Sequence, residues 1–81
     1  MKVLIDFYAT WCGPCRAMKP MVEELEKSYT VIKVDVDAEP EKAEQYGVLG
    51  IPTFIVMDGD KEVGRLTGTA TKGELEKLLR D

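Results

Sequence analysis

The only two cysteines of this chain, Cys12 and Cys15, are separated by two residues and follow an apolar run at residues 3–8. That run has the length and composition of a buried strand. Beyond the cysteines, apolar side chains recur at helical spacing over residues 17–25. The pair is therefore predicted at a strand-to-helix junction, which constrains the fold more than any other feature of the sequence.

The predicted position of Cys12 near a helix N-terminus has a chemical consequence. The helix dipole and the unpaired backbone N–H groups favour a thiolate there. Such a thiolate can attack a disulfide, and Cys15 is close enough to resolve the mixed disulfide that results. The alternative interpretation is two small buried side chains. Structural zinc requires four nitrogen or sulfur ligands, more than a chain without histidine or a third cysteine supplies. The pair predicts a thiol–disulfide oxidoreductase with a redox-active Cys12–Cys15 disulfide and no metal or other cofactor.

Composition excludes several other classes of protein. Apolar residues make up 44% of the 81 residues and charged residues 32%, as in an ordinary globular domain. The net charge of −4, without clustered Lys or Arg, does not indicate binding to nucleic acid or to an anionic membrane. No apolar stretch approaches the ~18 residues of a membrane span, and no signal-peptide pattern is present. Two closely spaced cysteines without a wider disulfide framework fit a reducing compartment, so we expect a cytoplasmic protein.

The periodicity predicts one α/β domain over residues 1–81, with the order β-α-β-α-β-β-α. Strands are expected at 2–8, 31–36, 53–57 and 62–67, and helices at 12–28, 40–46 and from 71 onward. The first helix is expected to be broken and kinked at Pro20. A mixed four-stranded sheet with helices on both faces buries these apolar faces.

Three local patterns add detail to this prediction. Residues 31–36 alternate apolar and charged side chains, which is typical of an edge strand. The tight-turn sequence at 58–61 predicts a hairpin between the last two strands. Thr71 and Glu74 have the spacing of a capping box that opens the final helix.

Residues 5–15, with the sequence IDFYATWCGPC, resemble the active-site sequence of the thioredoxin family. Further matches follow in order: Pro20, residues 33–37, Pro40, residues 46–53 with the sequence YGVLGIPT, and Gly68. The resemblance covers essentially the whole chain and implies that the mixed four-stranded sheet is a minimal thioredoxin-like fold. Family members usually carry one more strand and helix ahead of the strand at 2–8. The outer edge of strand 31–36 is therefore expected to be unpaired.

The resemblance implies reduction of protein disulfides, with electrons supplied by a thioredoxin-reductase-like donor, and a monomeric protein. Gly13 and Pro14, between the cysteines, resemble the reducing members of the family and are expected to tune the redox pair. Two alternatives remain open on sequence. One is a glutaredoxin-like protein recycled by glutathione, and the other is a thioredoxin-fold module that binds partners and has incidental cysteines.

Asp6 is unusual because it interrupts an apolar strand, where a carboxylate should be buried and its pKa raised. A perturbed carboxyl group beside a redox pair is a candidate proton carrier. By resemblance, Asp6 acts as the general base for Cys15, and Lys33 on the neighbouring strand pairs with Asp6 and tunes it. The alternatives are an Asp6 that reaches solvent or caps a loop, and an exposed Lys33 on an edge strand.

The Ile51-Pro52 bond is the second landmark. Sequence alone favours a trans bond, whereas the resemblance implies a cis bond facing the cysteines. The backbone of Ile51 can then pair with an extended substrate. An apolar docking surface around the sulfurs is expected from Trp11, Gly50, Ile51 and Gly68. For Trp11 the alternative is packing in the core.

Overall fold

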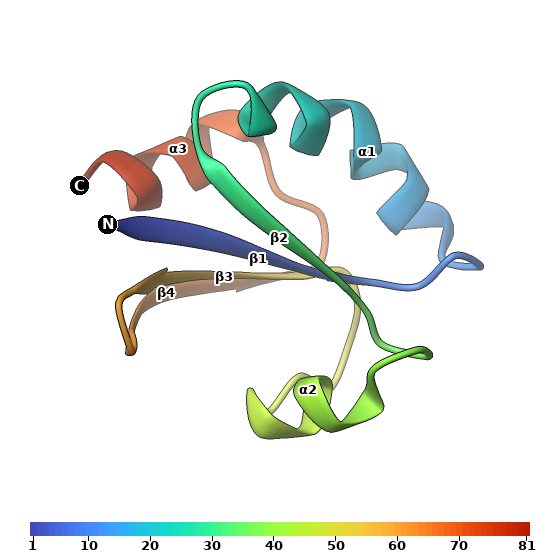
Figure 1. Cartoon of the computed structure of the whole chain (residues 1–81). Helices are drawn as coiled ribbons and strands as arrows, with labels where there is room; N and C mark the ends of the chain where they lie inside the picture. The colour runs from blue at the N-terminus through green and yellow to red at the C-terminus, as the bar shows by residue number, and fades with distance from the viewer.

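The computed structural model describes residues 1–81 as a mixed four-stranded sheet with helices on both faces (Figure 1). In chain order the elements are β1 (Lys2–Tyr8), α1 (Gly13–Glu26), β2 (Thr30–Asp35), α2 (Pro40–Gln45), β3 (Thr53–Asp58), β4 (Lys61–Thr67) and α3 (Lys72–Arg80). The strand order is β2-β1-β3-β4. β1 and β2 are parallel, and the other two pairs are antiparallel. This confirms the predicted order and architecture.

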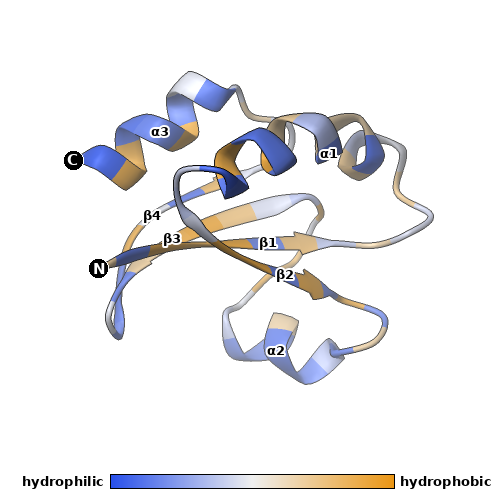
Figure 2. Ribbon diagram, turned by 45° about the horizontal axis from the view of Figure 1, so that its top comes forward, coloured by the Kyte–Doolittle hydropathy of each residue, from blue (hydrophilic) through white to orange (hydrophobic).

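The core forms two layers, one on each face of the sheet. β1 and β3 are central strands, so both of their faces are covered and they carry nearly continuous apolar sequence, visible in Figure 2. Because side chains alternate along a strand, Leu4 packs toward α1 and α3, whereas Phe7 and Ile55 lie in the layer beside α2. Asp6 is two residues after Leu4 and therefore lies on the same face of β1, which directs its carboxylate toward α1.

β2 is an edge strand, as its charge alternation predicted. It pairs only with β1, in a register that places Lys33 beside Asp6. Val31 contacts the core layer under α1, and Val34 belongs to the opposite layer. Lys33 is two residues after Val31 on the same strand. It therefore lies on the same face of the sheet as Asp6 and α1.

The expectation that Pro20 breaks the first helix is wrong. α1 continues from Gly13 to Glu26 with Pro20 inside it. A proline removes one N–H donor, and the remaining turns retain their own bonds. On its inner face, Val22 and Leu25 are fully buried in the main core, and this packing outweighs the local cost of the proline. The helix begins one residue after Cys12, which is its N-cap.

The short helix α2 is followed by a glycine, and its C-terminal end is hydrogen-bonded to a side chain of the β3–β4 hairpin. Gly47 has a positive φ of 66°, as expected for a residue just past a helix end. The Arg65 guanidinium, on β4, donates to the backbone oxygens of Tyr46 at 2.7 Å and Gly47 at 3.4 Å. Arg65 thus satisfies carbonyls at the C-terminus of α2, a role that no local pattern in the sequence predicts.

The predicted capping box at α3 is confirmed. The Thr71 hydroxyl accepts from the Glu74 N–H at 3.1 Å, and the Glu74 carboxylate accepts from the Thr71 N–H at 2.9 Å. Leu75 and Leu79 then lie buried against the sheet. The cap therefore fixes where the helix begins and which of its side chains reach the core.

Thr71→Ala is expected to lower the free energy of unfolding by about 1 kcal/mol, because the N-cap hydroxyl is lost while the helix N–H remains unpaired. In a domain of this size, this corresponds to a decrease in melting temperature of roughly 4–8 °C. Thermal and urea denaturation measure both quantities. Thr69→Ala is the matched control, since Thr69 is exposed and lies ahead of the cap. Equal effects of the two substitutions would contradict this role of the cap.

Candidate functional site

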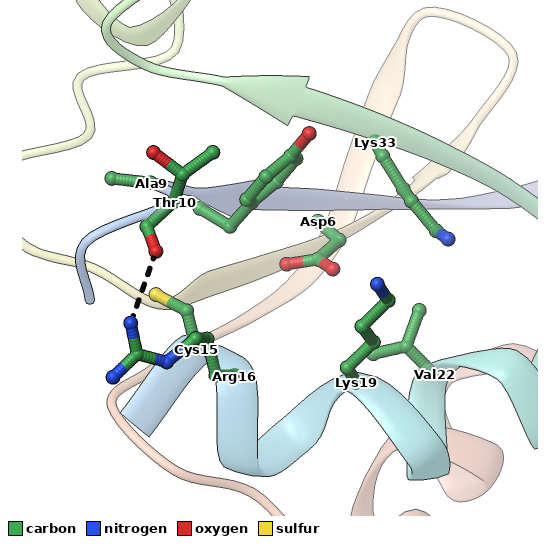
Figure 3. Close-up of a pocket in the computed structure, with 9 residues that line it drawn as sticks. Asp6, Ala9, Thr10, Cys15, Arg16, Lys19, Val22 and Lys33 are labelled. Atoms are coloured by element: carbon green, nitrogen blue, oxygen red, sulfur yellow. Dashed lines mark hydrogen bonds between the residues drawn. The ribbon is translucent and has the colours of Figure 1, made fainter. Parts of the chain in front are cut away.

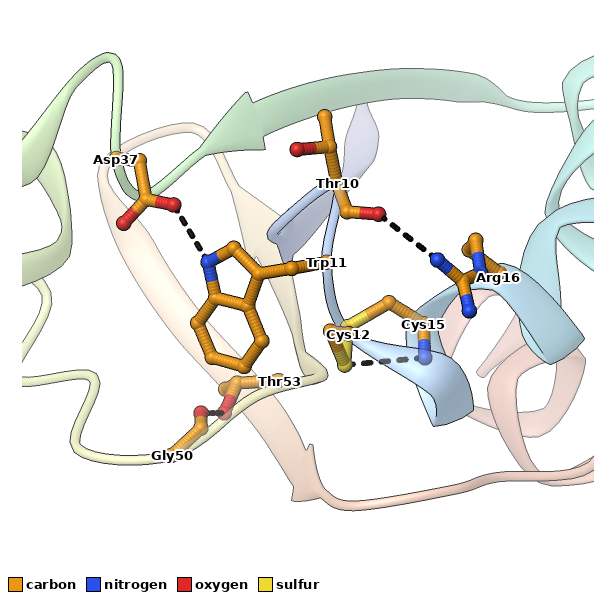
Figure 4. Close-up of a disulfide and its surroundings, with 8 residues drawn as sticks. All are labelled: Thr10, Trp11, Cys12, Cys15, Arg16, Asp37, Gly50 and Thr53. Carbon is orange, nitrogen blue, oxygen red and sulfur yellow. Dashed lines mark hydrogen bonds between the residues drawn. A yellow bond between two sulfur atoms is a disulfide. The ribbon is translucent and has the colours of Figure 1, made fainter.

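Cys12 and Cys15 form a disulfide at the N-terminal end of α1 (Figure 4). Their Cα atoms are 5.2 Å apart, within the usual range for a disulfide. Cys12 has extended backbone angles, and its Sγ accepts a hydrogen bond from the Cys15 N–H at 3.2 Å. This N–H is one of the unpaired donors of the first helical turn. The same donor and the positive end of the helix dipole stabilise negative charge on Cys12 Sγ after reduction.

Asp6 is buried, as its apolar neighbours in the sequence predicted, and only 8% of its surface is exposed. This disfavours an Asp6 that reaches solvent or caps a loop. Burial is the main cause that raises the Asp6 pKa, to about 6. Lys33 lowers this pKa and Glu26 raises it. An Asp6 carboxyl group of this kind exchanges a proton near neutral pH, where an Asp in water is fully ionised.

Asp6 shares a cavity of about 320 Å³ with Cys15. The cavity lies between β1 and α1, and in Figure 3 the Cys15 sulfur and the Asp6 carboxylate both point into it. Its other lining residues are Tyr8, Ala9, Thr10, Arg16, Lys19, Val22 and Lys33. A space of this volume that has charged and polar side chains in its wall admits water. It therefore offers a route for a proton between the Cys15 thiol and the Asp6 carboxylate.

Lys33 does not form the expected ion pair with Asp6. Its Nζ lies 2.8 Å from Glu26 Oε1, at the end of α1. This bond is the largest cause that raises the Lys33 pKa. The sequence could not distinguish the two partners, because Asp6 and Glu26 are on different elements that both pack beside Lys33. Lys33 still lines the cavity with Asp6.

Trp11 lies on the surface, with 66% of its area exposed, so the alternative of core packing is wrong. Its Nε1 donates a hydrogen bond to Asp37 Oδ2 at 2.7 Å, shown in Figure 4. Sequence reasoning did not select Asp37. The usable signal was topological: parallel β1 and β2 end at the same edge of the sheet, so the loops that carry Trp11 and Asp37 lie side by side.

The Ile51-Pro52 peptide bond is cis, as the family resemblance implied. Ile51 packs against the cluster that contains both cysteines, and Pro52 is fully buried. The loop ahead of the bond is fixed by the Thr53 hydroxyl, which donates to the Gly50 oxygen at 2.6 Å. This arrangement presents the backbone of Gly50 and Ile51 at the surface beside the disulfide.

A shallow apolar groove connects Trp11 to this loop. Its lining residues are Trp11, Val36, Ala43, Val48, Leu49, Gly50 and Ile51. Leu49 is fully exposed and was not selected from the sequence, since a single leucine in a loop carries no pattern. Gly68 does not line the groove: it has a positive φ of 94°, and its N–H donates to the Pro52 oxygen at 2.7 Å. Gly68 therefore supports the cis-proline loop through a backbone hydrogen bond.

No cluster of three or more His, Cys, Asp or Glu side chains is placed to hold a metal ion. None of the three helices is both long and apolar enough to cross a membrane. The chemistry available at this site is that of two thiols, one buried carboxyl group and the cations around it.

Comparison with known proteins agrees with this geometry. The thioredoxin family model matches residues 1–81. A thioredoxin of Alicyclobacillus acidocaldarius is 45% identical, over 98% of this chain and 79% of its own length. A thioredoxin of Chlamydia muridarum is 49% identical, over 95% of this chain and 78% of its own length. A bifunctional thioredoxin reductase/thioredoxin of Mycobacterium leprae is 43% identical, over 98% of this chain and 18% of its own length.

The likeness extends to solved structures. A mutant thioredoxin of Halobacterium salinarum superposes with a TM-score of 0.92 at 38% identity, covering 98% of this chain and 72% of its own. A Fasciola hepatica thioredoxin superposes with a TM-score of 0.88 at 40% identity, covering 98% of this chain and 79% of its own.

Proposed function

Because this chain belongs to the thioredoxin family and is a dithiol–disulfide oxidoreductase, we propose that it reduces protein disulfides with Cys12 as nucleophile. The observation that carries this assignment is the hydrogen bond from the Cys15 N–H to Cys12 Sγ at the start of α1. Cys15 lacks an equivalent position, since it lies within the first turn and faces the cavity that holds Asp6.

The reaction proceeds in two thiol exchanges. The Cys12 thiolate attacks one sulfur of the substrate disulfide, which forms a mixed disulfide and releases the first substrate thiolate. Cys15 then gives its proton to the Asp6 carboxylate and attacks Cys12 Sγ. This second step forms the Cys12–Cys15 disulfide and releases the second substrate thiolate. The substrate disulfide gains two electrons, and the dithiol loses two.

Substrate binding is assigned to the surface around the disulfide. Trp11, Gly50 and Ile51 line the apolar groove, and an extended segment of substrate can pair with the backbone of Ile51. Pro52 contributes no N–H donor, and together with Gly68 it holds this backbone in place. We assign Gly13, Pro14 and Lys33 to tuning of the redox pair.

The electron donor in this proposal is a thioredoxin-reductase-like protein. The name of the Mycobacterium leprae relative, in which a reductase and a thioredoxin share one chain, supports this pairing. The proposal further takes residues 1–81 as a single functional domain, monomeric and cytoplasmic, that needs no cofactor besides its own disulfide.

Catalysed reduction of a generic protein disulfide tests the proposal. With a small dithiol as reductant, the wild type is expected to accelerate the reaction, and Cys12→Ser is expected to return it to the uncatalysed rate. A folded wild type without acceleration would contradict a general reductase and favour the binding module. Replacing the dithiol with either a thioredoxin reductase or glutathione then identifies the donor. Turnover with glutathione alone would support the glutaredoxin-like alternative.

A further inference from the structure

Glu26 connects α1 to the edge strand beside the buried carboxyl group. The β1–β2 register places Lys33 next to Asp6, yet the Lys33 ammonium forms its ion pair with Glu26 at 2.8 Å. Lys33 and Asp6 do not form an ion pair with each other. Glu26 is the last residue of α1, so the helix end places a competing carboxylate within reach of this lysine.

The surroundings of Asp6 are otherwise predominantly basic. The titratable groups that line its cavity are Tyr8 on β1, Lys33 on β2, and Cys15, Arg16 and Lys19 on α1. On the same helix, the charge of Glu26 acts on Asp6 directly and also on Lys33, and the charge of Glu23 acts on Lys33. Arg16 is directed away, because its guanidinium donates to the Thr10 oxygen at 3.4 Å. On the other side, β3 contributes Phe54, which has no charge. Lys33 and Lys19 are therefore the cations that can approach the carboxylate (Figure 3).

The electrostatics agree with this geometry. Glu26 raises the Asp6 pKa, and Lys33 lowers it. The side chains of Lys33 and Glu26 are 36% and 39% exposed, so solvent screens the pair and its strength depends on salt. Even so, the position of one ammonium group determines how much positive charge faces a carboxylate that is itself buried.

We propose that Glu26 is a positioning residue for Asp6: it holds Lys33 Nζ at the end of α1 and keeps this cation from pairing with the Asp6 carboxylate. The proposal rests on the role of Asp6 as the proton acceptor for Cys15. Without Glu26, Lys33 turns toward Asp6 and stabilises the ionised carboxylate. Asp6 then becomes a weaker base for the Cys15 proton.

Titration of Asp6 in Glu26→Gln tests this directly. The carboxyl ¹³C chemical shift of Asp6, assigned by its absence in Asp6→Asn, gives the titration midpoint in the oxidised, folded protein. The midpoint is expected to fall by about 1 pH unit, the lower end of the effect of an opposite charge at close range. Glu24→Gln is the matched control: it removes the same charge from the same helix, but Glu24 pairs with Lys27 and Lys72. An unchanged midpoint in Glu26→Gln, or an equal decrease in Glu24→Gln, would overturn the proposal.

The same substitution made in a Lys33→Met variant shows whether Glu26 acts on Asp6 through Lys33. In Lys33→Met, the further change Glu26→Gln is expected to move the midpoint by less than half as much as in the wild type. An undiminished shift would mean that Glu26 acts by its own field, and the positioning role would be wrong.

The pH profile of mixed-disulfide resolution separates this proposal from the catalytic role on which it rests. If Asp6 is the base, Glu26→Gln shifts the acidic limb of the rate profile to lower pH by the same amount as the NMR midpoint. A midpoint that moves while the profile stays fixed would refute Asp6 as the base and still confirm that Glu26 positions Lys33.

Discussion

Cys15→Ser is expected to convert the protein from a turnover catalyst into one that remains covalently attached to its substrate. Cys12 keeps its place at the N-cap of α1, so attack on a substrate disulfide proceeds. Serine cannot displace the substrate from Cys12, because its hydroxyl is not a nucleophile toward sulfur at neutral pH. With a thioredoxin reductase as electron donor, steady-state activity falls to the uncatalysed rate. In the absence of a small dithiol, non-reducing gels or intact-mass measurement detect one substrate chain per molecule, and added dithiol releases it.

Cys12→Ser is the matched control, because it makes the same change on the other side of the disulfide. It is expected to lose activity equally and to trap no substrate, because Cys15 faces the cavity that it shares with Asp6, whereas the helix N–H donates to Cys12 Sγ. The difference between two inactive variants therefore assigns the nucleophile. If Cys12→Ser traps substrate and Cys15→Ser does not, the roles of the two thiols are the reverse of those proposed here.

Most of the fold followed from local sequence patterns. The period of apolar residues determined the elements in order, and charge alternation at 31–36 identified the edge strand. The capping box at Thr71 carried its own geometric signal. The expected break at Pro20 was wrong because the effect of a proline depends on tertiary packing: buried side chains on the inner face of α1 stabilise the helix on both sides of the proline. The kink expected at Pro20 remains a prediction.

The contacts of the site were harder to predict from the sequence, because they join elements that are distant along the chain. Cys12, Cys15 and Asp6 were recognised from position and chemistry in β1 and the turn that follows it. Asp37 and Glu26 were not, since each becomes meaningful only when the sheet register is known. A carboxylate among many on a charged helix has no local feature that identifies it as the partner of Lys33.

Asp6 also affects stability, because it keeps a charge in the interior at neutral pH. Its pKa is about 6 in the folded protein, against an ordinary value of 3.8. Between these two pH values the folded state holds a proton that the unfolded state has released. Raising the pH through this window therefore lowers the free energy of unfolding. At 1.36 kcal/mol per pKa unit, the total loss approaches ~3 kcal/mol once the pH is above the folded-state pKa.

Asp6→Asn is accordingly expected to raise the free energy of unfolding at pH 7 by about 2–3 kcal/mol, since the amide has the same shape and no charge. Urea denaturation at pH 4 and pH 7 measures this. The wild type loses stability between these pH values, and the variant lacks that part of the loss. Asp60→Asn, in the exposed hairpin turn, controls for the change in net charge. A variant that is less stable than the wild type at pH 7 would contradict the cost assigned to the buried carboxylate.

The same substitution is expected to slow the resolution of the mixed disulfide. Without the Asp6 base, the step depends on spontaneous ionisation of Cys15. General-base catalysis typically contributes ~100-fold or more. Resolution at pH 7 should therefore fall at least ~10-fold, and the rate in the variant should increase as the pH is raised. Quenched-flow analysis of the mixed disulfide resolves this step. A more stable but slower variant would show that the buried carboxylate is retained for proton transfer, at the expense of stability.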